Sequence, residues 1–139
     1  MAETLLFELV SPAKLVISQP VEMVVVPGAE GDFGALPQHA PLISAVRPGV
    51  IDIYEGGKVI NRIFVAGGVA EVTGDRCTVL AEEALPVAEL DSGKIATRAA
   101  EAEKALAAAD NDFARDQAKL ALAVAQAMLQ VLQEKPAAH

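Results

Sequence analysis

Apolar and polar residues alternate in short runs along the first 82 residues of the chain, which is the period-two pattern of strands with one buried face. Residues 4–10 show it most clearly, because Leu5, Phe7 and Leu9 fall on one side of an extended backbone. Turn residues separate this run from further short runs, most of them rich in β-branched residues. Together the runs predict nine strands, at 4–10, 14–18, 21–26, near 35–37, 42–46, 50–54, 59–65, 69–73 and 77–82.

Two pairs of these strands are predicted to form hairpins. Gly56 and Gly57 lie between the sixth and seventh predicted strands, where glycine can adopt the positive φ angles of a tight turn. Gly74 and Asp75 separate the eighth and ninth. About eight to ten short strands within about 80 residues indicate an antiparallel β-sandwich or barrel.

The composition changes after the last predicted strand. A connector at 85–89 is followed by a stretch in which glycine is nearly absent and alanine abundant. Two helices are therefore predicted, at about 92–109 and 112–134, with Asp91 or Ser92 capping the first and the polar residues 110–112 capping the second. The loop between them is short, so the helices must be antiparallel. The expected organisation is a sandwich domain at 1–85 and a two-helix hairpin at 86–139.

Both predicted helices carry a narrow apolar stripe with 4-3-4-3 spacing, which is typical of two helices packed along a seam. The second helix also carries Leu122, Leu129 and Leu132 on another face. We expect the sandwich or another protein to cover them, because exposed leucines are unfavourable. The predicted seam positions are Ile95, Ala99, Ala102, Leu106 and Ala109 in the first helix, and Phe113, Gln117, Leu120, Val124, Ala127 and Val131 in the second.

The composition of the chain disfavours some kinds of binding partner. Of the 139 residues, 53% are hydrophobic and only 4% aromatic, so the core is aliphatic. The formal net charge of −8 disfavours binding to nucleic acid and to anionic lipid. No apolar run is long enough to span a bilayer, and the acidic N-terminal residues do not resemble a signal peptide.

The sequence offers no catalytic constellation and no metal-ligand spacing, so an enzyme with its own active site is not expected. His39 is interpreted as a turn residue bonded to local backbone rather than a ligand. Gly67 and Gly68 precede no helix, which favours a bulge or a close backbone approach over a phosphate-binding loop. Cys77, the only cysteine, is interpreted as a small buried hydrophobic residue.

Residues 27–53 are the most distinctive stretch, because glycines and prolines alternate there with apolar residues. Such punctuation predicts short strands joined by specified turns. Glu30 and Asp32 fall at the tip of the first turn, where they should point into solvent or at a partner. Three segments stand out: Pro27-Gly28-x-x-Gly31-x-Phe33-Gly34-x-Leu36-Pro37-x-His39-Ala40-Pro41-Leu42 with Arg47-Pro48-Gly49, then Ala66-Gly67-Gly68-Val69-Ala70-Glu71-Val72, and Thr78-Val79-Leu80-Ala81-Glu82.

In spacing and order these segments resemble the epsilon subunit of the bacterial F-type rotary ATP synthase, and the resemblance extends over nearly the whole chain. It implies a flattened β-sandwich followed by a helical hairpin. It also implies a non-catalytic part of the central stalk, which rotates with the gamma subunit and sits on the membrane c-ring. The expected location is the cytoplasmic face of the bacterial inner membrane, as a peripheral subunit without lipid insertion.

The resemblance also implies roles for particular residues. The turn Glu30, Gly31, Asp32 and Phe33 resembles the loop that meets the c-ring. The segment His39, Ala40 and Pro41 resembles the part that lies near gamma. The helices of such subunits can extend toward the catalytic alpha and beta subunits and restrain ATP hydrolysis. The cationic residues expected to make that contact here are Arg98, Arg115 and Lys119.

The helices depart from the family pattern where some members bind ATP. The motif Asp-x-x-Arg-Ala is present only as Arg98-Ala99, because Ile95 stands where the Asp belongs. Val124 and Ala125 stand where basic residues are expected, and phosphate recognition needs those charges. We therefore expect no cofactor and no ATP binding. One alternative stays open from the sequence, a stand-alone small-molecule-binding sandwich whose hairpin makes a dimer.

Overall fold

The computed structural model describes residues 3–134, and it divides between Val87 and Ala88 into two units that are described separately here. Residues 135–139, at the end of the predicted hairpin domain, lie outside the described part. The first unit contains ten strands. They are β1 (Leu5–Ser11), β2 (Lys14–Val21), β3 (Met23–Gly28), β4 (Gly31–Ala35), β5 (Leu42–Val46), β6 (Gly49–Glu55), β7 (Lys58–Val65), β8 (Gly68–Val72), β9 (Arg76–Ala81) and β10 (Ala84–Pro86).

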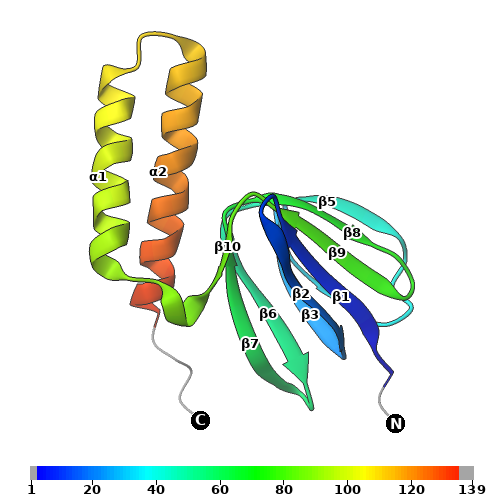
Figure 1. Cartoon of the computed structure of the whole chain (residues 1–139). Helices are drawn as coiled ribbons and strands as arrows, with labels where there is room; N and C mark the ends of the chain where they lie inside the picture. Colours follow the sequence, from blue (N-terminus) through cyan, green and yellow to red (C-terminus); the bar gives the residue numbers. More distant parts are fainter. Residues whose placement is uncertain (1–2, 135–139) are drawn as a thin grey trace. The chain divides into compact units, whose positions relative to one another are not determined.

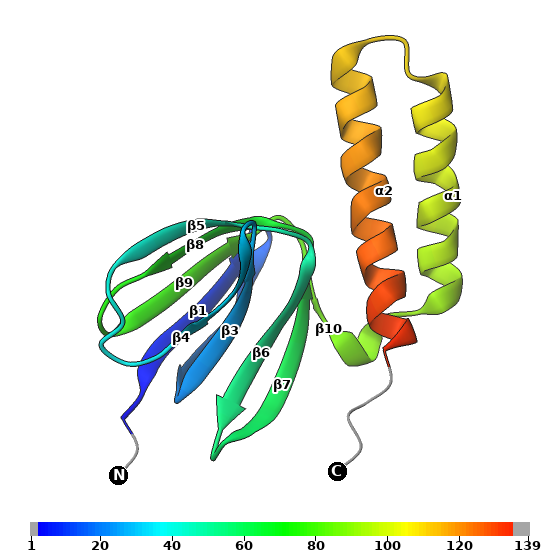
Figure 2. The same cartoon turned by 180° about the vertical axis from the view of Figure 1, so that it is seen from behind.

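These strands form one sheet that folds over into two layers (Figure 1). Hydrogen bonding follows the order β10-β7-β6-β3-β5-β8-β9-β1-β2, and β4 pairs with β3 beside this path (Figure 2). The fold-over lies between β3 and β5, which pair only at Gly28 and Val46. All pairs are antiparallel as predicted, except that β1 runs parallel to β9. The predicted antiparallel sandwich of about eight to ten short strands is confirmed, with ten strands observed.

The core of the sandwich lies between the two layers and is aliphatic. Inward residues alternate with more exposed ones along β1, β8 and β9, as the sequence pattern predicted, whereas β7 is exposed in its first half and buried at its end. Phe7 and Leu9 on β1, Ile51 and Ile53 on β6 and Val79 on β9 have no exposed surface. Cys77 is buried in the same cluster, which confirms its interpretation as a core residue.

Three predicted strand boundaries were wrong. Pro20 was expected to separate two strands, but β2 continues through it, because β2 is the last strand of the sheet and an edge strand tolerates proline. The short strand expected near 35–37 is β4, which starts at Gly31 directly after a tight turn. The expected connector at 85–89 includes β10, which pairs with β7, and a 3-10 turn at Val87–Glu89.

The second unit is a pair of helices, α1 (Ser92–Ala108) and α2 (Asp112–Gln133). Asp91 caps α1, because its Oδ1 accepts the backbone N–H groups of Gly93 at 2.8 Å and Lys94 at 3.1 Å. Asn111 caps α2 by accepting the N–H of Ala114 at 2.8 Å. Both caps fall on residues that the sequence had offered for this role.

The apolar seam was predicted correctly for α1 and only partly for α2. The α1 positions are buried or half-buried, with Ile95 and Ala102 almost fully covered. On α2, Val124 and Val131 are buried, but Phe113 is 74% exposed and Leu120 is 43% exposed. The α2 residues that are buried instead are Ala118, Ala125 and Met128.

Candidate functional site

The predicted c-ring-facing residues form the hairpin between β3 and β4. Gly28 pairs with Gly31, so Ala29 and Glu30 are the turn residues. Glu30, Gly31 and Asp32 are exposed, while Phe33 is half-buried and packs against the core. Gly31 has a φ of +138°, which a residue with a side chain rarely adopts. The turn therefore presents one free acidic tip residue on a backbone that only glycine fits easily.

Close packing explains two further glycines of the signature. A Cβ atom on Gly28 would lie 2.7 Å from the Gly31 carbonyl oxygen and 3.0 Å from the Phe33 ring. A Cβ atom on Gly49 would lie 3.0 Å from the Cβ of Pro27. Real Cβ atoms essentially never approach another atom as closely as 2.7 Å, so a larger residue at Gly28 would push the hairpin apart. At Gly49 the contact is tight, and Pro27 would have to move by a few tenths of an ångström to admit a side chain. The sequence spacing thus encodes the shape of the turn.

Arg47 holds this hairpin to the end of β5. Its Nη1 donates to the carbonyl oxygen of Gly28 and its Nη2 donates to Asp32 Oδ1, each at 2.5 Å. Backbone bonds reinforce the junction, from Ala29 N to Ala45 O at 2.8 Å and from Arg47 N to Pro27 O at 2.9 Å. Sequence reasoning quoted Arg47 in the signature without giving it a role. The structure shows that Arg47 pairs with Asp32, whose side chain stays exposed.

The predicted gamma-facing residues form the connection between β4 and β5. His39 is half-buried, and its Nδ1 donates to the neighbouring Ala40 carbonyl at 2.5 Å, so it bonds local backbone as expected. Ala40 and Pro41 are exposed. Gln38 adopts a φ of +67° and its N–H donates to the Gly74 carbonyl, which ties the connection to the β8–β9 turn. The connection is therefore a fixed structure with two exposed residues at its end.

The structure does not bring the two predicted contact segments together. The Glu30 turn precedes β4 and lies beside the end of β5, since Gly28 pairs with both Gly31 and Val46. The His39–Pro41 segment, residues 39–41, follows β4 and precedes β5. The two segments thus lie at opposite ends of the same strands, and a single partner surface is not needed to explain both.

An exposed apolar row, which sequence reasoning missed, crosses the outer face of one layer. Cross-strand pairing aligns its members on five adjacent strands, β5, β8, β9, β1 and β2. Leu15, Val69 and Leu80 are 58%, 46% and 56% exposed. We call this set the outer apolar row: Ala45, Val69, Leu80, Val10 and Leu15.

Polar residues border the outer apolar row. The aligned positions two residues away are Glu71, Thr78 and Glu8, and Arg76 pairs with Glu8 at 3.4 Å. Ile43 on β5 extends the apolar surface on this side and is 71% exposed. A contiguous exposed apolar patch with a polar border is typical of a protein-binding surface. The sequence alone does not reveal the outer apolar row, because its residues are far apart in the chain and only the pairing of the strands aligns them.

Gly67 and Gly68 allow β8 and β9 to approach closely, as predicted. Both have positive φ angles, +117° and +149°. A Cβ atom on Gly68 would lie 2.0 Å from the carbonyl oxygen of Leu80. Cys77 lies at the other end of the β8–β9 pair, opposite Val72, and burial raises the pKa of its thiol to about 11, so at neutral pH it is a protonated core group. The two glycines therefore serve the close approach of the strands rather than a phosphate site, and Cys77 is a core residue rather than a reactive thiol.

The helical unit carries the predicted cationic contact residues on its surface. Arg98, Arg115 and Lys119 are exposed, and Arg115 is paired with Asp112 at 3.0 Å. The positions where ATP-binding relatives would need charged residues are covered: Ile95 is 3% exposed, Val124 5% and Ala125 0%. Within residues 3–134 no three carboxylate, thiol or imidazole groups are placed to hold a metal ion. Neither described helix has the length and hydropathy needed to cross a membrane.

Comparisons with known proteins agree on one family. The model of the β-sandwich domain of the ATP synthase delta/epsilon chain matches residues 4–87. The ATP synthase epsilon chain of Rhodospirillum rubrum is 58% identical over 129 residues, which is 93% of this chain and 96% of that protein. The epsilon chain of Paramagnetospirillum magneticum is 59% identical over 128 residues, 92% of this chain and 96% of the relative.

Two solved structures have the same fold over most of the chain. A chain in the mitochondrial ATP synthase of Euglena gracilis, a structure of OSCP, F1 and the c-ring, superposes with a TM-score of 0.77 at 25% identity. The match covers 94% of this chain and 82% of that one. A chain from the central stalk and c-ring of the Tetrahymena thermophila enzyme superposes with a TM-score of 0.66 at 15% identity, over 92% of this chain and 96% of its own.

Proposed function

This chain belongs to the ATP synthase delta/epsilon chain family, and from that premise we propose that it joins the catalytic head to the membrane c-ring as a central-stalk subunit, with gamma as its direct partner. It is a non-catalytic subunit of ATP synthase. Its proposed location is peripheral, on the cytoplasmic face of the bacterial inner membrane. The alternative of a free-standing ligand-binding sandwich is set aside, because relatives matched over 96% of their length are ATP synthase chains.

The outer apolar row is the observation that carries the proposed docking to gamma. Directly paired residues in a sheet have side chains about 4.5–5.5 Å apart, so the row is a continuous strip across five strands. Burying one leucine side chain stabilises a complex by roughly 1.5–3 kcal/mol. Ile43 lies near the start of β5, between the segment at 39–41 and Ala45, and it is 71% exposed on the same face as Ala45, so we assign the segment and the row to one proposed gamma surface.

The affinity of the purified chain for purified gamma tests this surface. Leu80→Lys places a charge in the centre of the outer apolar row, and it should weaken binding about tenfold to a hundredfold. Ile60→Lys is the matched control, because Ile60 is exposed to a similar extent, 51% against 56%, on β7 of the other layer. Equal affinities for the two variants would exclude the outer apolar row as the gamma surface.

The acidic β3–β4 turn is the proposed contact with the c-ring. Glu30 is its exposed tip residue, and Asp32 is engaged by Arg47, so Glu30 is the acidic side chain left to meet a polar or basic loop. Replacing both carboxylates with lysine should reduce coupling between hydrolysis and proton pumping. Glu30→Lys alone tests the contact with the c-ring, because it leaves the ion pair between Asp32 and Arg47 in place. Asp32→Asn is the control, because it removes the charge of that ion pair and leaves Glu30 unchanged. Pumping that is unchanged in the reassembled Glu30→Lys enzyme would contradict this contact.

The helical hairpin is proposed to restrain ATP hydrolysis through contact with the catalytic subunits. Arg115 and Lys119 are four residues apart and exposed on one face of α2, which supports a cationic contact. The restraint should be weak, because Arg115 is already paired with Asp112. Removing residues 88–139 leaves all ten strands of the sandwich intact. The truncated chain should still bind gamma, and ATP synthase that contains it should hydrolyse ATP modestly faster than the enzyme with the full chain. An unchanged rate of ATP hydrolysis would contradict the inhibitory role.

A further inference from the structure

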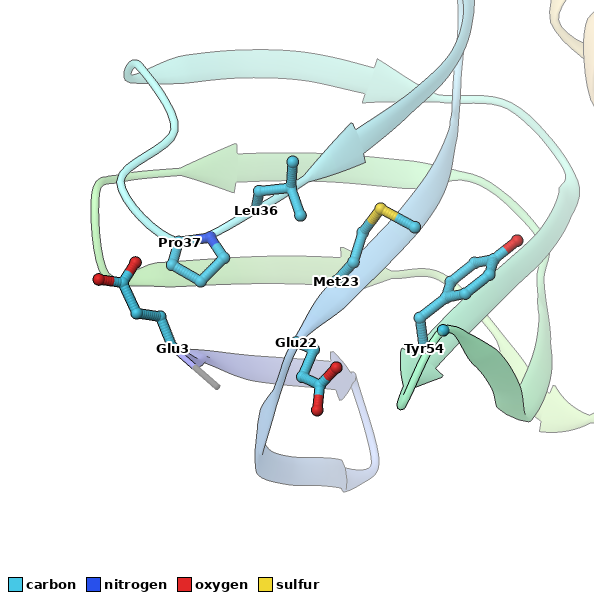
Figure 3. Close-up of a pocket in the computed structure, with 7 residues that line it drawn as sticks. Glu3, Glu22, Met23, Leu36, Pro37 and Tyr54 are labelled. Carbon is cyan, nitrogen blue, oxygen red and sulfur yellow. The ribbon is translucent and has the colours of Figure 1, made fainter. Parts of the chain in front are cut away.

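A groove of about 450 Å³ opens on the sandwich where β3 begins and β6 ends. It lies at the opposite end of β4 from the Glu30 turn, next to the residues that lead to His39. Figure 3 shows Met23 and Leu36 between Pro37 and Tyr54, with the carboxylates of Glu3 and Glu22 at the margin. We call it the Tyr54 groove, and it is lined by Glu3, Glu22, Met23, Leu36, Pro37, Tyr54 and Gly57.

The lining combines an apolar floor with negative charge. Met23, Leu36 and Pro37 supply apolar surface, and Leu36 is 51% exposed. Tyr54, the only tyrosine of the chain, supplies a ring whose face attracts cations. The two charged residues in the lining are both glutamates, and no lysine or arginine is among them. This arrangement fits a group that is apolar along its length and positive at its end, as lysine and arginine side chains are.

Two features keep the Tyr54 groove open. The backbone N–H of Gly56 donates to Glu22 Oε1 at 3.0 Å, which holds this carboxylate against the β6–β7 turn and leaves its other oxygen for a partner. Gly57 has a φ of +75°, and its missing side chain leaves empty space at the groove margin. The thioether of Met23 lies beside Gly34, 3.5 Å from the position of a Cβ atom there, which is an ordinary van der Waals distance. Methionine adapts its shape readily to a bound side chain.

We propose that the Tyr54 groove binds a segment of a neighbouring ATP synthase subunit that carries a lysine or arginine next to an apolar residue. The charge of the lining selects a cationic partner, and complementary charge guides such associations. The groove is shallow and mostly open to solvent, so a small ligand would remain largely exposed, whereas ligand sites normally enclose most of their ligand. A chain segment held by contacts elsewhere needs no such enclosure.

This inference rests on the proposed function, and photo-crosslinking in the assembled enzyme separates the two. The full chain with p-benzoylphenylalanine in place of Leu36 is reassembled into ATP synthase, irradiated and digested for mass spectrometry. The same residue in place of Leu80 is the control, since it reports the outer apolar row. We expect the Leu36 position to crosslink to a segment with a lysine or arginine near the attachment point. A crosslink from position 80 with none from position 36 would refute binding at the Tyr54 groove, and it would leave the proposed central-stalk function intact.

A charge reversal supplies an independent readout. Glu3→Lys with Glu22→Lys should lower the affinity of the full chain for ATP synthase depleted of this subunit by about tenfold, with a larger loss at low salt. Glu82→Lys with Glu89→Lys makes the same change in charge on exposed residues outside the groove. A Leu36 crosslink to a second copy of this chain or to a segment without basic residues would overturn the proposal. So would equal losses for the two double variants.

Discussion

Replacing Arg47 should show how firmly the β3–β4 hairpin is held to β5. The guanidinium makes two contacts, one to the part-buried carbonyl of Gly28 and one to the exposed carboxylate of Asp32. A hydrogen bond from a charged donor contributes about 1.5–3 kcal/mol, and an exposed ion pair about 0.2–1 kcal/mol. Arg47→Ala should therefore lower the free energy of unfolding of the sandwich by about 2–4 kcal/mol. Asp32→Ala should cost less than about 1 kcal/mol, because it removes only the exposed contact.

Urea unfolding of the full chain measures these losses. Tyr54 lies on β6 and is the only tyrosine, in a chain without tryptophan, so intrinsic fluorescence reports the sandwich rather than the helices. With a urea dependence of about 2 kcal/mol per molar, the middle of the usual range for small domains, Arg47→Ala should move the midpoint by about 1–2 M. Arg47→Lys is the control, since a single ammonium group cannot span both acceptors and should recover only part of the loss.

Two results would refute this account of Arg47. The first is an Arg47→Ala midpoint no lower than that of Asp32→Ala, which would mean that the Gly28 contact adds nothing. The second is strict additivity of the two alanine substitutions in the double variant. Side chains in direct contact are expected to give a coupling energy, and its absence would mean that the ion pair does not form in solution.

Three further predictions concern the strand junction, the buried thiol and the helices. Gly68→Ala should cost more than about 4 kcal/mol and prevent stable folding, because the new Cβ would meet the Leu80 carbonyl, whereas Gly74→Ala, with open space at that position, should be tolerated. The pKa of the Cys77 thiol is raised from 9.0 to about 11, so only the unfolded state ionises between these values; stability should fall from pH 9 to 11 in the wild type and less in Cys77→Ala, as followed by thermal unfolding. Calorimetry with ATP up to about millimolar concentration should give no saturable heat, because Ile95 is buried where a carboxylate would be needed, and a micromolar affinity would contradict this.

Local rules predicted most of the sandwich because its turns are local. Gly56 and Gly57 have φ angles of +62° and +75°, and the hairpin they form was readable from two adjacent residues. Pro20 was misread because the same residue breaks a central strand and fits an edge strand. Its place in the sheet depends on which strands pair, and β2 is an edge only because no strand follows it in the order. That information is not local.

The error in α2 has a different cause, the abundance of alanine. A helix with apolar residues on several faces permits more than one seam, and spacing alone does not choose among them. The structure buries Ala118, Ala125 and Met128 and leaves Phe113 exposed. Small residues let two helices approach closely, so alanine can occupy the seam, and the 4-3-4-3 spacing also fits a stripe other than the one that is buried. The candidate site shows the same limit, since Asp32 and Arg47 are 15 residues apart and only the folded turn pairs them.

The bonds around Arg47 connect the two surfaces of the proposed function. The β3–β4 turn, the proposed contact with the c-ring, is fixed to β5 by the backbone bond from Ala29 to Ala45, and Ala45 is the first member of the outer apolar row. From Ala45 the row continues through paired strands, each joined to the next by ladder hydrogen bonds. A load applied at Glu30 would therefore reach the proposed gamma surface through hydrogen bonds and close-packed glycines. The proposed role between two partners needs this stiffness, and it would account for a signature made of residues that set backbone shape rather than residues that perform chemistry.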